Sequence, residues 1–335
     1  MKSILITGAS GFVGSFLVEE ALRQGFETWA GVRATSSRKY LQKPGTHFLE
    51  LDFSRADVLC RQLEEHRQAH GAFDYIVHCA GVTKCIDPAE FDRVNHGQTA
   101  LFADTLLRLG MVPHRFIFVS TLSVFGAIHE QDFQPIRETD TPQPNTAYGR
   151  SKLEAERYLQ GLAGFPWVFL RPTGVYGPRE RDYFLMVQSI ARHVDVAAGW
   201  SRQDLTFVYV KDVVQAVFRA IERDVVHRAY FLSDGQVYSS RTFSDLVRRE
   251  LGNPAVVRIK FPLWMLKVVS AFAEAWAKRR HATSTLNRDK YNIMKQRNWQ
   301  CDIEPARKEL GYAPAYDLAS GVPETIVWYR ENGWL

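Results

Sequence analysis

The sequence predicts an α/β protein with a doubly wound parallel sheet and a smaller α/β lobe interleaved into its C-terminal half. Short apolar runs alternate with helix-forming stretches, as in repeated strand–helix–strand units. A glycine-rich turn follows the first run, and hydroxyl side chains follow a later one that ends at Val119. The chain has 335 residues, 46% of them hydrophobic, which suffices for a large core in one extended domain or two joined lobes.

Composition and charge exclude several classes of function. The formal net charge is +5 and no Lys/Arg block dominates, so nucleic acid is not an expected partner. The four cysteines form no CxxC pair and no metal-like spacing with histidine, which favours a cytoplasmic protein without a bound metal. The N-terminal apolar run is too short for a signal peptide, and no stretch approaches the roughly 18 apolar residues of a membrane span.

The first strand is predicted over 3–7 and is followed by three glycines and a helix over 15–24 that stops at Gly25. A dinucleotide phosphate site needs this order. The turn must be tight, the backbone must approach the pyrophosphate, and the helix N-terminus must supply N–H donors. The candidate cofactor contacts in this stretch are Gly8, Ser10, Gly11, Phe12, Val13 and Gly14.

The second strand is predicted over 26–32. An NAD-preferring fold usually has an acidic side chain at its end for the ribose 2′-hydroxyl, but the run 33–39 contains no carboxylate. Arg33 can pair with a 2′-phosphate, and Thr35, Ser36 and Arg38 add further donors. We therefore expect NADP(H) as the preferred cofactor and NAD(H) as the alternative. The simpler interpretation is a solvated basic loop.

A third strand is predicted over 46–52 and ends in Asp52-Phe53, two candidate cofactor contacts. An acid at the carboxyl end of a parallel strand is well placed for the adenine amino group. The alternative is that Asp52 caps the helix predicted to begin near Ser54.

The next strand is predicted over 75–79, and the small residues at its end let the backbone approach a ligand. His78 lies inside this apolar run, so we expect a core residue rather than a catalytic base. A helix is predicted over 91–109, in which Asn95 either locks the backbone of the site or is exposed. The candidate cofactor contacts of the strand end are Cys79, Ala80 and Gly81.

A fifth strand is predicted over 115–119 and leads into the hydroxyl-rich run 120–126. Hydroxyl groups at the carboxyl end of a parallel strand face the ligand crevice. Thr121 precedes Tyr148 by 27 residues, so the two side chains can converge on one pocket.

Tyr148 and Lys152 are four residues apart in a strongly helix-forming stretch, which places them on one helix face. An isolated tyrosine has a pKa of about 10, and a nearby ammonium lowers that value toward the range of proton exchange at neutral pH. The spacing also arises by chance on solvated helix faces, so its meaning depends on the surrounding motifs.

In their order along the chain, these motifs resemble those of the extended short-chain dehydrogenases/reductases, the NAD-dependent epimerase/dehydratase superfamily. The resemblance covers nearly the whole chain and implies a Rossmann fold and an enzyme. The matching segments are 7–14, 78–81, 119–126, Tyr148-x-x-x-Lys152, 171–178, 208–212 and Gly311-Tyr312.

The resemblance implies a catalytic set of Thr121, Tyr148 and Lys152. Tyr148 would be the general acid/base on the reacting oxygen, and Thr121 would hydrogen-bond the same oxygen. Lys152 would hold the nicotinamide ribose and lower the pKa of Tyr148. Asn95 matches a structural asparagine of the family, and Val175 the backbone contact to the carboxamide. The remaining expected contacts are Val119, Pro172 and Gly174 for the cofactor and Thr83 and Ser123 for the substrate.

Two departures from the family pattern bear on the reaction. Leu122-Ser123 replace the Asp-Glu pair of dehydratases, which disfavours nucleotide-sugar dehydration. The run 172–174 lacks an asparagine that is common in sugar-modifying members. Together with Arg33, these departures favour NADP(H)-linked reductases and hydroxysteroid-type dehydrogenases.

The second half of the chain is expected to form the substrate lobe. Residues 1–171 plus about 205–233 are assigned to the dinucleotide-binding domain, and about 172–204 and 234–335 to the substrate lobe. Asp212 is expected to be the N-cap of a helix that starts at Val213. The expected elements are helices over 184–193, 213–221, 242–251 and 322–332 and strands over 204–210 and 229–232.

The segment 261–276 is apolar almost all round and is followed by a basic run at 278–280. An all-round apolar helix is usually buried, so a core helix of the substrate lobe is the favoured interpretation. The alternative is an interfacial helix or lid through which 261–280 contacts a membrane surface.

The leading hypothesis is an NAD(P)-dependent oxidoreductase that transfers a hydride between nicotinamide and a secondary alcohol or carbonyl of a moderately apolar small molecule. The first alternative is a nucleotide-sugar 4-epimerase with tightly bound NAD, and the second is a non-catalytic nucleotide-sensing protein. A homodimer is expected, and the substrate itself cannot be derived from the sequence.

Overall fold

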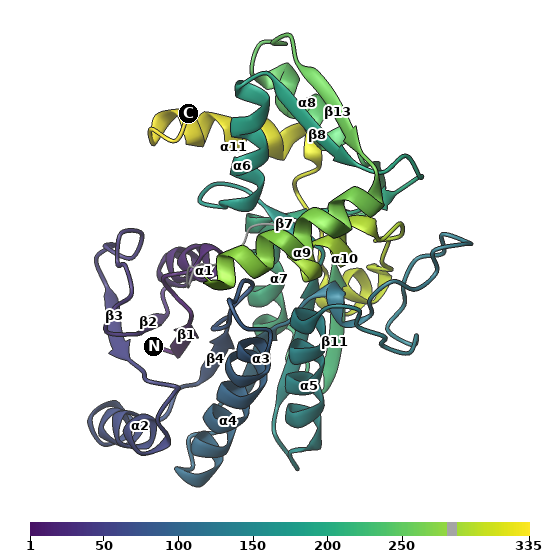
Figure 1. Cartoon of the computed structure of the whole chain (residues 1–335). Coiled ribbons are helices and arrows are strands. Elements are labelled where there is room, and N and C mark those ends of the chain that lie inside the picture. The colour runs from purple at the N-terminus through teal and green to yellow at the C-terminus, as the bar shows by residue number, and fades with distance from the viewer. Residues whose placement is uncertain (280–286) are drawn as a thin grey trace.

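The computed structural model describes residues 1–279 and 287–335. Its centre is a seven-stranded sheet in the order β11-β6-β5-β4-β1-β2-β3, and every strand pair in it is parallel. The predicted doubly wound α/β fold is therefore confirmed (Figure 1). The strands are β1 (Ser3–Thr7), β2 (Glu27–Val32), β3 (Thr46–Glu50), β4 (Tyr75–His78), β5 (Arg115–Val119), β6 (Trp167–Pro172) and β11 (Arg228–Leu232).

Helices cover both faces of this sheet, and each face has its own apolar core. On one face, α1 and α7 pack beside each other, and their apolar side chains join one buried cluster. On the other face, α2, α4 and α5 contribute to the second cluster. The helices are α1 (Phe12–Arg23), α2 (Ala56–His70), α4 (Gln98–Arg108), α5 (Ala147–Gly161) and α7 (Val210–Glu222).

A smaller group of elements lies above the carboxyl edge of the sheet (Figure 1). Its own core is rich in aromatic side chains from α6, α8 and α11. Its paired strands are β8 (Val194–Ala198) with β13 (Val257–Phe261), β7 (Gly174–Tyr176) with β10 (Phe207–Tyr209) and β9 (Asp204–Leu205) with β12 (Tyr238–Ser239). Its helices are α6 (Asp182–Ala191), α8 (Thr242–Glu250), α9 (Leu263–Arg279), α10 (Arg288–Lys295) and α11 (Leu318–Glu331).

The chain crosses between the two groups more than once. After β6 it leaves the central sheet to form α6 and β8, and it returns with β11, which pairs with β6 at the edge of the sheet. The prediction that 229–232 rejoins the central sheet is thus confirmed. The two lobes are interleaved in the sequence.

Two predictions in this region are wrong in detail. The single strand predicted over 204–210 is two short strands separated by Thr206, whose hydroxyl bonds to the carbonyl of Trp299 at 2.5 Å. Asp212 is not an N-cap, because α7 already begins at Val210. Its carboxylate instead accepts the backbone N–H groups of Ala315 at 2.9 Å and Tyr316 at 3.1 Å, and so fixes the chain before α11.

The helix predicted over 91–109 is interrupted. It consists of α3 (Ala89–Phe91), a π-helical segment (Asp92–Gly97) and α4. Two further short segments are a 3₁₀ turn (Leu122–Val124) and a second π-helical segment (Ala306–Leu310).

The interpretation of 261–276 as a core helix is wrong. α9 is helical, but Trp264 is 69% exposed and Phe272 is 73% exposed. Only Leu266 and Ser270 on this helix are buried among the side chains that the structure describes. Within the described ranges, no helix has the length and apolar character needed to cross a membrane.

Candidate active site

A cavity of about 940 Å³ opens at the carboxyl ends of β1, β4, β5 and β6, between the sheet and the smaller lobe. It brings together residues that lie far apart in the sequence. Among the predicted site residues it is lined by Gly8, Gly11, Phe12, Val13, Gly14, Cys79, Gly81, Thr83, Val119, Thr121, Tyr148, Lys152, Pro172 and Val175.

The glycine turn after β1 is closely packed. Gly8 has a φ of +66°, and a Cβ there would lie 2.7 Å from the backbone nitrogen of Ala80. A Cβ on Gly14 would lie 2.2 Å from the carbonyl oxygen of Gly8. Gly11 is the N-cap of α1 and has no side chain to occupy the helix N-terminus. The turn therefore leaves a cradle for an anionic group beside the first N–H groups of α1.

Asn95 ties three parts of the site together. Its side chain is fully buried in the π-helical segment. The amide oxygen accepts the N–H of Val82 at 2.8 Å, and the amide nitrogen donates to the Val82 carbonyl and to Ser151 Oγ, both at 3.0 Å. Of the two alternatives for Asn95, the structure shows the one in which it locks the site backbone. The strand end after β4 is thereby fixed to α5.

His78 is a core residue, as predicted. Its two ring nitrogens contact Thr7 Oγ1 at 2.7 Å and Thr99 Oγ1 at 3.0 Å. Burial lowers the pKa of His78 to about 3, so the ring is neutral at physiological pH. Its contacts hold β4 against β1 and α4.

The start of α5 is fully hydrogen-bonded. The N-cap Thr146 accepts the N–H of Gly149 at 2.9 Å. Asp289 of α10 accepts the N–H groups of Ala147 and Tyr148, each at 3.1 Å. All three donors of the first turn thus have partners, which fixes the backbone that carries the Tyr148 phenol.

Gly149 lets this turn approach the loop after β5. A Cβ at Gly149 would lie 2.4 Å from the carbonyl oxygen of Ser123. The same loop is held by Thr121, whose Oγ1 accepts the Ser123 N–H at 3.1 Å. Thr121 and Tyr148 consequently face the same cavity, while Ser123 is buried behind them and is not part of the cavity wall.

The pKa of Tyr148 differs from the expectation, and the pKa of Lys152 is also shifted. Burial raises the pKa of Tyr148 to about 12, opposed by a hydrogen-bonding contact with the Thr121 hydroxyl. Lys152 donates to the carbonyl of Val119 at 2.8 Å, and burial lowers its pKa to about 8. The expected lowering of the Tyr148 pKa by Lys152 is wrong for the polypeptide alone, because enclosure outweighs every other influence on the phenol.

Ser120 lies in the hydroxyl-rich run that is expected to face the ligand crevice, and it lines the cavity. The residue is 3% exposed, and its buried hydroxyl has no hydrogen-bond partner among the described residues. A buried hydroxyl without a partner is costly unless a bound molecule supplies one. Together with the glycine cradle, this hydroxyl fits a cavity built to hold a polar ligand.

The remaining predicted cofactor contacts lie outside the cavity wall. Arg33 is exposed at the end of β2, and its N–H donates to Ser36 Oγ at 3.0 Å. The Arg38 guanidinium lies 4.5 Å from the Phe48 ring centroid. Ser10, Ala80 and Gly174 are near neighbours of lining residues but do not line the cavity themselves.

Asp52 and Phe53 have structural contacts. Asp52 Oδ1 accepts the N–H of Ser54 at 3.0 Å and its hydroxyl at 2.5 Å, so it closes the turn before α2. The N-cap of α2 is Arg55, so the alternative in which Asp52 caps this helix is wrong. Phe53 packs edge-on against Phe102 at 5.2 Å between centroids.

The far end of the cavity is formed by residues that the sequence did not single out. Asp182 and Lys290 line this end and form an ion pair at 3.6 Å, and Lys84, which does not line the cavity, also pairs with Asp182. The remaining lining is largely apolar. No local motif marks these residues, because they come from three separate elements, α6, β8 and α10. They include Tyr183, Leu185, Met186, Val194, Val196 and Met294.

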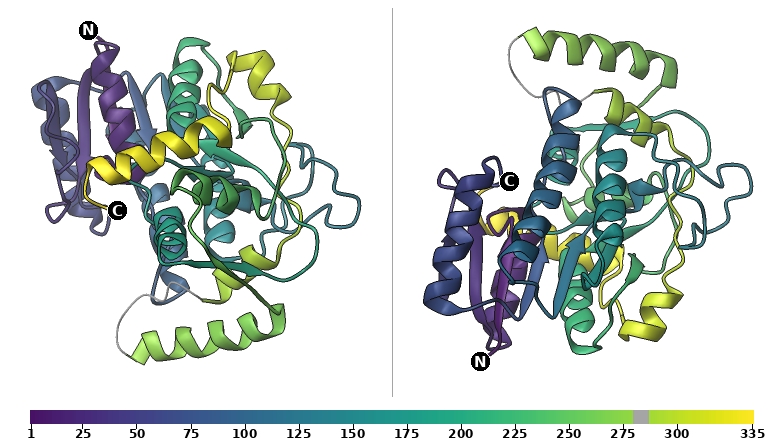
Figure 2. Two further views of the ribbon diagram at one scale, coloured as in Figure 1. Left: turned by 90° about the horizontal axis from the view of Figure 1, so that it is seen from above. Right: turned by 90° about the horizontal axis from the view of Figure 1, so that it is seen from below.

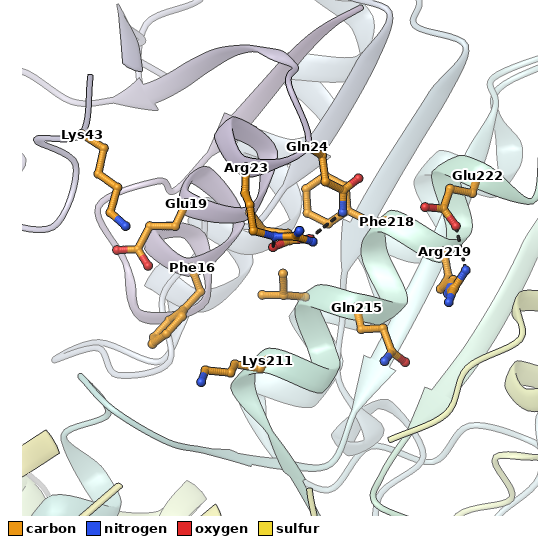
Figure 3. A pocket seen from close by; sticks show the side chains of 12 residues that line it. Phe16, Glu19, Arg23, Gln24, Lys43, Lys211, Gln215, Phe218, Arg219 and Glu222 are labelled. Atoms are coloured by element: carbon orange, nitrogen blue, oxygen red, sulfur yellow. Dashed lines mark hydrogen bonds and ion pairs between the residues drawn. The ribbon is translucent and has the colours of Figure 1, made fainter. Parts of the chain in front are cut away.

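A second hollow of about 560 Å³ lies between α1 and α7 (Figure 3). Its charged side chains are mostly paired with each other, as in Arg23–Glu20 at 2.5 Å and Arg219–Glu222 at 2.9 Å. Since these charges are already compensated, we place the functional site in the larger cavity.

Comparison with known proteins supports this assignment. A family model described as the NAD dependent epimerase/dehydratase family matches residues 4–232. A UDP-glucose 4-epimerase of Vibrio cholerae is 25% identical, over 97% of this chain and 94% of the relative. A dTDP-glucose 4,6-dehydratase of Streptomyces griseus is 24% identical, over 98% and 94%. The crystal structure of a Thermotoga maritima UDP-glucose 4-epimerase with UDP-glucose has the same fold, with a TM-score of 0.78 at 21% identity over 98% of this chain and 99% of that one.

The parallel sheet and the family match together define an enzyme of the extended short-chain dehydrogenase/reductase kind. Since the family model spans more than half of its length, this chain belongs to the NAD dependent epimerase/dehydratase family. The resemblance seen in the sequence is confirmed. The non-catalytic alternative is left without support.

Proposed function

We propose that this enzyme transfers a hydride between a nicotinamide dinucleotide and a secondary alcohol or carbonyl carbon of a moderately apolar substrate. The observation that carries the proposal is the cavity itself. It places Thr121, Tyr148 and Lys152 opposite the glycine turn, so that proton-transfer groups and a phosphate cradle share one space.

Tyr148 acts as the proton donor and acceptor in this proposal. With a pKa of about 12 it is a neutral phenol at physiological pH, ready to donate to a carbonyl oxygen during reduction. Thr121 offers its hydroxyl to the same oxygen. The buried Lys152 supplies positive charge beside the cavity, and Ser120 offers a hydroxyl that no described residue occupies. The bound dinucleotide would accept or supply the hydride.

Some of the proposed cofactor contacts line the cavity, and the others lie outside its wall. The glycine turn and the first turn of α1 would hold the pyrophosphate. Arg33, Ser36 and Arg38 would meet a ribose 2′-phosphate, which supports NADP(H) as the preferred form over NAD(H). The other proposed contacts are Ser10, Phe12, Val13, Asp52, Phe53, Cys79, Ala80, Gly81, Val119, Pro172, Gly174 and Val175.

The substrate end supports a ligand that is mostly apolar. Leu185, Met186, Val194, Val196 and Met294 form most of its wall. Lys290 at this end and Lys84 outside the cavity wall already share one carboxylate, Asp182. Thr83 remains the proposed polar contact, and Ser123 would act only through the loop that it supports.

The decisive experiment compares wild-type protein with Tyr148→Phe. Thermal-shift measurements with NADP(H) and NAD(H) first identify the cofactor, because a bound ligand stabilises the folded protein by mass action. A panel of ketones and secondary alcohols is then tested for NAD(P)H turnover. We expect Tyr148→Phe to bind cofactor normally and to lose at least about 100-fold in kcat. Unchanged turnover in this variant would refute the catalytic role.

A second candidate function is a nucleotide-sugar 4-epimerase. It is favoured by the Vibrio cholerae relative, which aligns along nearly the whole chain. Such an enzyme would retain NAD through purification and show no net turnover of added cofactor. Mass spectrometry of the unfolded, purified protein distinguishes it from an oxidoreductase that exchanges its cofactor.

In this proposal the two lobes bind different molecules. Residues 1–171 and about 205–233 would bind the dinucleotide, and about 172–204 and 234–335 the substrate. A homodimer in the cytoplasm stays a prediction, and light scattering on the purified protein tests the dimer.

A further inference from the structure

Helix α9 presents a stripe of large apolar side chains to solvent. Trp264, Val268 and Phe272 are 69%, 47% and 73% exposed, and Trp276 continues the four-residue spacing at 59% exposure. Positions four apart lie on one face of a helix, so these side chains form a continuous row. In both views of Figure 2, α9 lies at the periphery of the molecule. An exposed row of this size marks an interaction surface.

Positive charge is concentrated in the same part of the chain. Residues 258–297 contain ten Lys or Arg and two Asp or Glu, a formal charge of +8, so the rest of the chain carries −3. Arg258 and Lys290 are paired with Asp245 and Asp182 outside this segment, which leaves a smaller excess of positive charge. Lys260 and Lys267 are exposed beside the apolar row, and neither forms an ion pair with a described acidic residue. The partner of this surface is therefore apolar in its interior and negatively charged at its rim.

The geometry of the helix fits a surface rather than a span. α9 has 17 residues, which corresponds to about 26 Å of helix. The buried side chains of Leu266 and Ser270 anchor the inner side of α9. Only its outer side can therefore insert into a lipid surface. Tryptophan side chains prefer the boundary between lipid and water, and basic residues on the flanks meet acidic headgroups.

The position of α9 links this surface to the cavity. The strand before it, β13, pairs with β8, which carries the lining residues Val194 and Val196. The helix after it, α10, packs against α9 and carries the lining residues Lys290 and Met294. A surface that holds α9 would thus lie beside the apolar end of the cavity.

We propose that α9 is a peripheral docking helix for an anionic lipid bilayer. The helix lies in the plane of the headgroups, with Trp264, Val268 and Phe272 inserted and Lys260 and Lys267 on the acidic lipids. A second copy of the chain is the less suitable occupant, because a twofold interface would bring the excess positive charge of the two copies together. The inference is independent of the reaction that the cavity catalyses.

The test uses the full-length protein and two kinds of vesicle. One is phosphatidylcholine alone, and the other is equal parts of phosphatidylcholine and phosphatidylglycerol. Co-sedimentation gives the bound fraction. We expect the anionic vesicles to bind at least about tenfold more tightly, with a strong loss at high salt. No binding to anionic vesicles would overturn the proposal.

Variants then assign the binding to α9. Trp264→Ser with Phe272→Ser should weaken binding by at least about tenfold. Lys260→Glu with Lys267→Glu should remove the preference for anionic vesicles. The matched control is Leu107→Ser with Val327→Ser, two exposed apolar positions on α4 and α11, which should bind like the wild type.

Two results would contradict the assignment. One is wild-type binding by the Trp264→Ser, Phe272→Ser variant with an unchanged thermal unfolding profile. The other is a stable dimer in light scattering that this variant converts to monomer, which would make a second copy the occupant.

Discussion

The carboxylate of Asp289 accepts the backbone N–H of Tyr148 at 3.1 Å across 141 residues of chain. The second oxygen of the same carboxylate accepts the N–H of Ala147. The proposed catalytic helix is therefore capped by a residue of the C-terminal segment. A negative charge at a helix N-terminus is also favourable to the helix dipole.

Replacing this cap should affect catalysis more than cofactor binding. We expect Asp289→Ala to cost about 1 kcal/mol of stability, as for other helix caps. Because the Tyr148 backbone loses its anchor, kcat should fall about tenfold while the KM for the dinucleotide stays constant. Steady-state kinetics and thermal unfolding measure the two effects.

The matched control for this prediction is Asp317→Ala. Asp317 caps α11 by accepting the Ser320 N–H at 2.8 Å and does not line the cavity. It should lose similar stability and keep the wild-type kcat. Equal losses of kcat in the two variants would assign Asp289 a purely structural role.

A second prediction concerns the two glycines at the ends of α5. Gly149→Ala would place a Cβ 2.4 Å from the carbonyl oxygen of Ser123, so the loop with Thr121 must move away from Tyr148. We expect a lower Tm and at least a tenfold loss of kcat, of the order that misplaced catalytic groups cause. In Gly161→Ala the new Cβ meets nothing within 4 Å, so helix propensity should raise stability by up to about 1 kcal/mol. A tolerated Gly149→Ala would show that the close contact is unimportant.

The third prediction is a pH dependence set by Lys152. Its pKa of about 8 means that the ammonium is present below that pH and lost above it. Tyr148, with a pKa of about 12, keeps its proton throughout this range. The kcat/KM for reduction should therefore be flat below pH 8 and fall about tenfold per pH unit above it. In Lys152→Arg the falling limb should vanish, and its persistence would assign the limb to another group.

The same group affects stability, with a definite sign. The pKa of Lys152 lies below the ordinary value of 10.5, so between these two values the unfolded chain binds more protons than the folded one. Stability from this group should rise with pH between about 8 and 10.5, and Lys152→Met should remove that rise in thermal unfolding curves.

The fourth prediction tests cofactor preference. Arg33→Ala should weaken NADP(H) about tenfold in fluorescence titration and leave NAD(H) unchanged, because a bidentate contact with the 2′-phosphate is lost. Lys39→Ala, in the same exposed loop, removes one positive charge and should change neither affinity by more than about twofold. Equal affinity for both dinucleotides in wild type and Arg33→Ala would remove the case for NADP(H).

The sequence was sufficient where the signal is local. The strands of the central sheet are short apolar runs bounded by small residues, and the glycine turn between β1 and α1 needs no information beyond its own stretch. His78 was correctly assigned to the core because apolar residues surround it on the same strand. Asn95 left two alternatives open, since a buried and an exposed amide look alike without the contact to Val82.

The sequence was insufficient where the burial or the contacts of a residue depend on elements distant in the chain. The apolar composition of α9 indicated burial, but composition does not say whether other elements cover the outer face of a helix. The raised pKa of Tyr148 follows from enclosure by elements that sequence spacing does not place. The Asp289 cap and the apolar cavity wall likewise depend on contacts between segments more than a hundred residues apart.

The place of β11 in the sheet has a consequence for biosynthesis. Because β11 completes the sheet and ends at Leu232, all seven strands are synthesised before the last third of the chain, and they can pair once β11 has left the ribosome. Asp289 is translated only afterwards, so in the nascent chain Thr146 still caps α5 but the N–H groups of Ala147 and Tyr148 lack their carboxylate partner. The central sheet can therefore be complete before the start of the proposed catalytic helix is fully hydrogen-bonded.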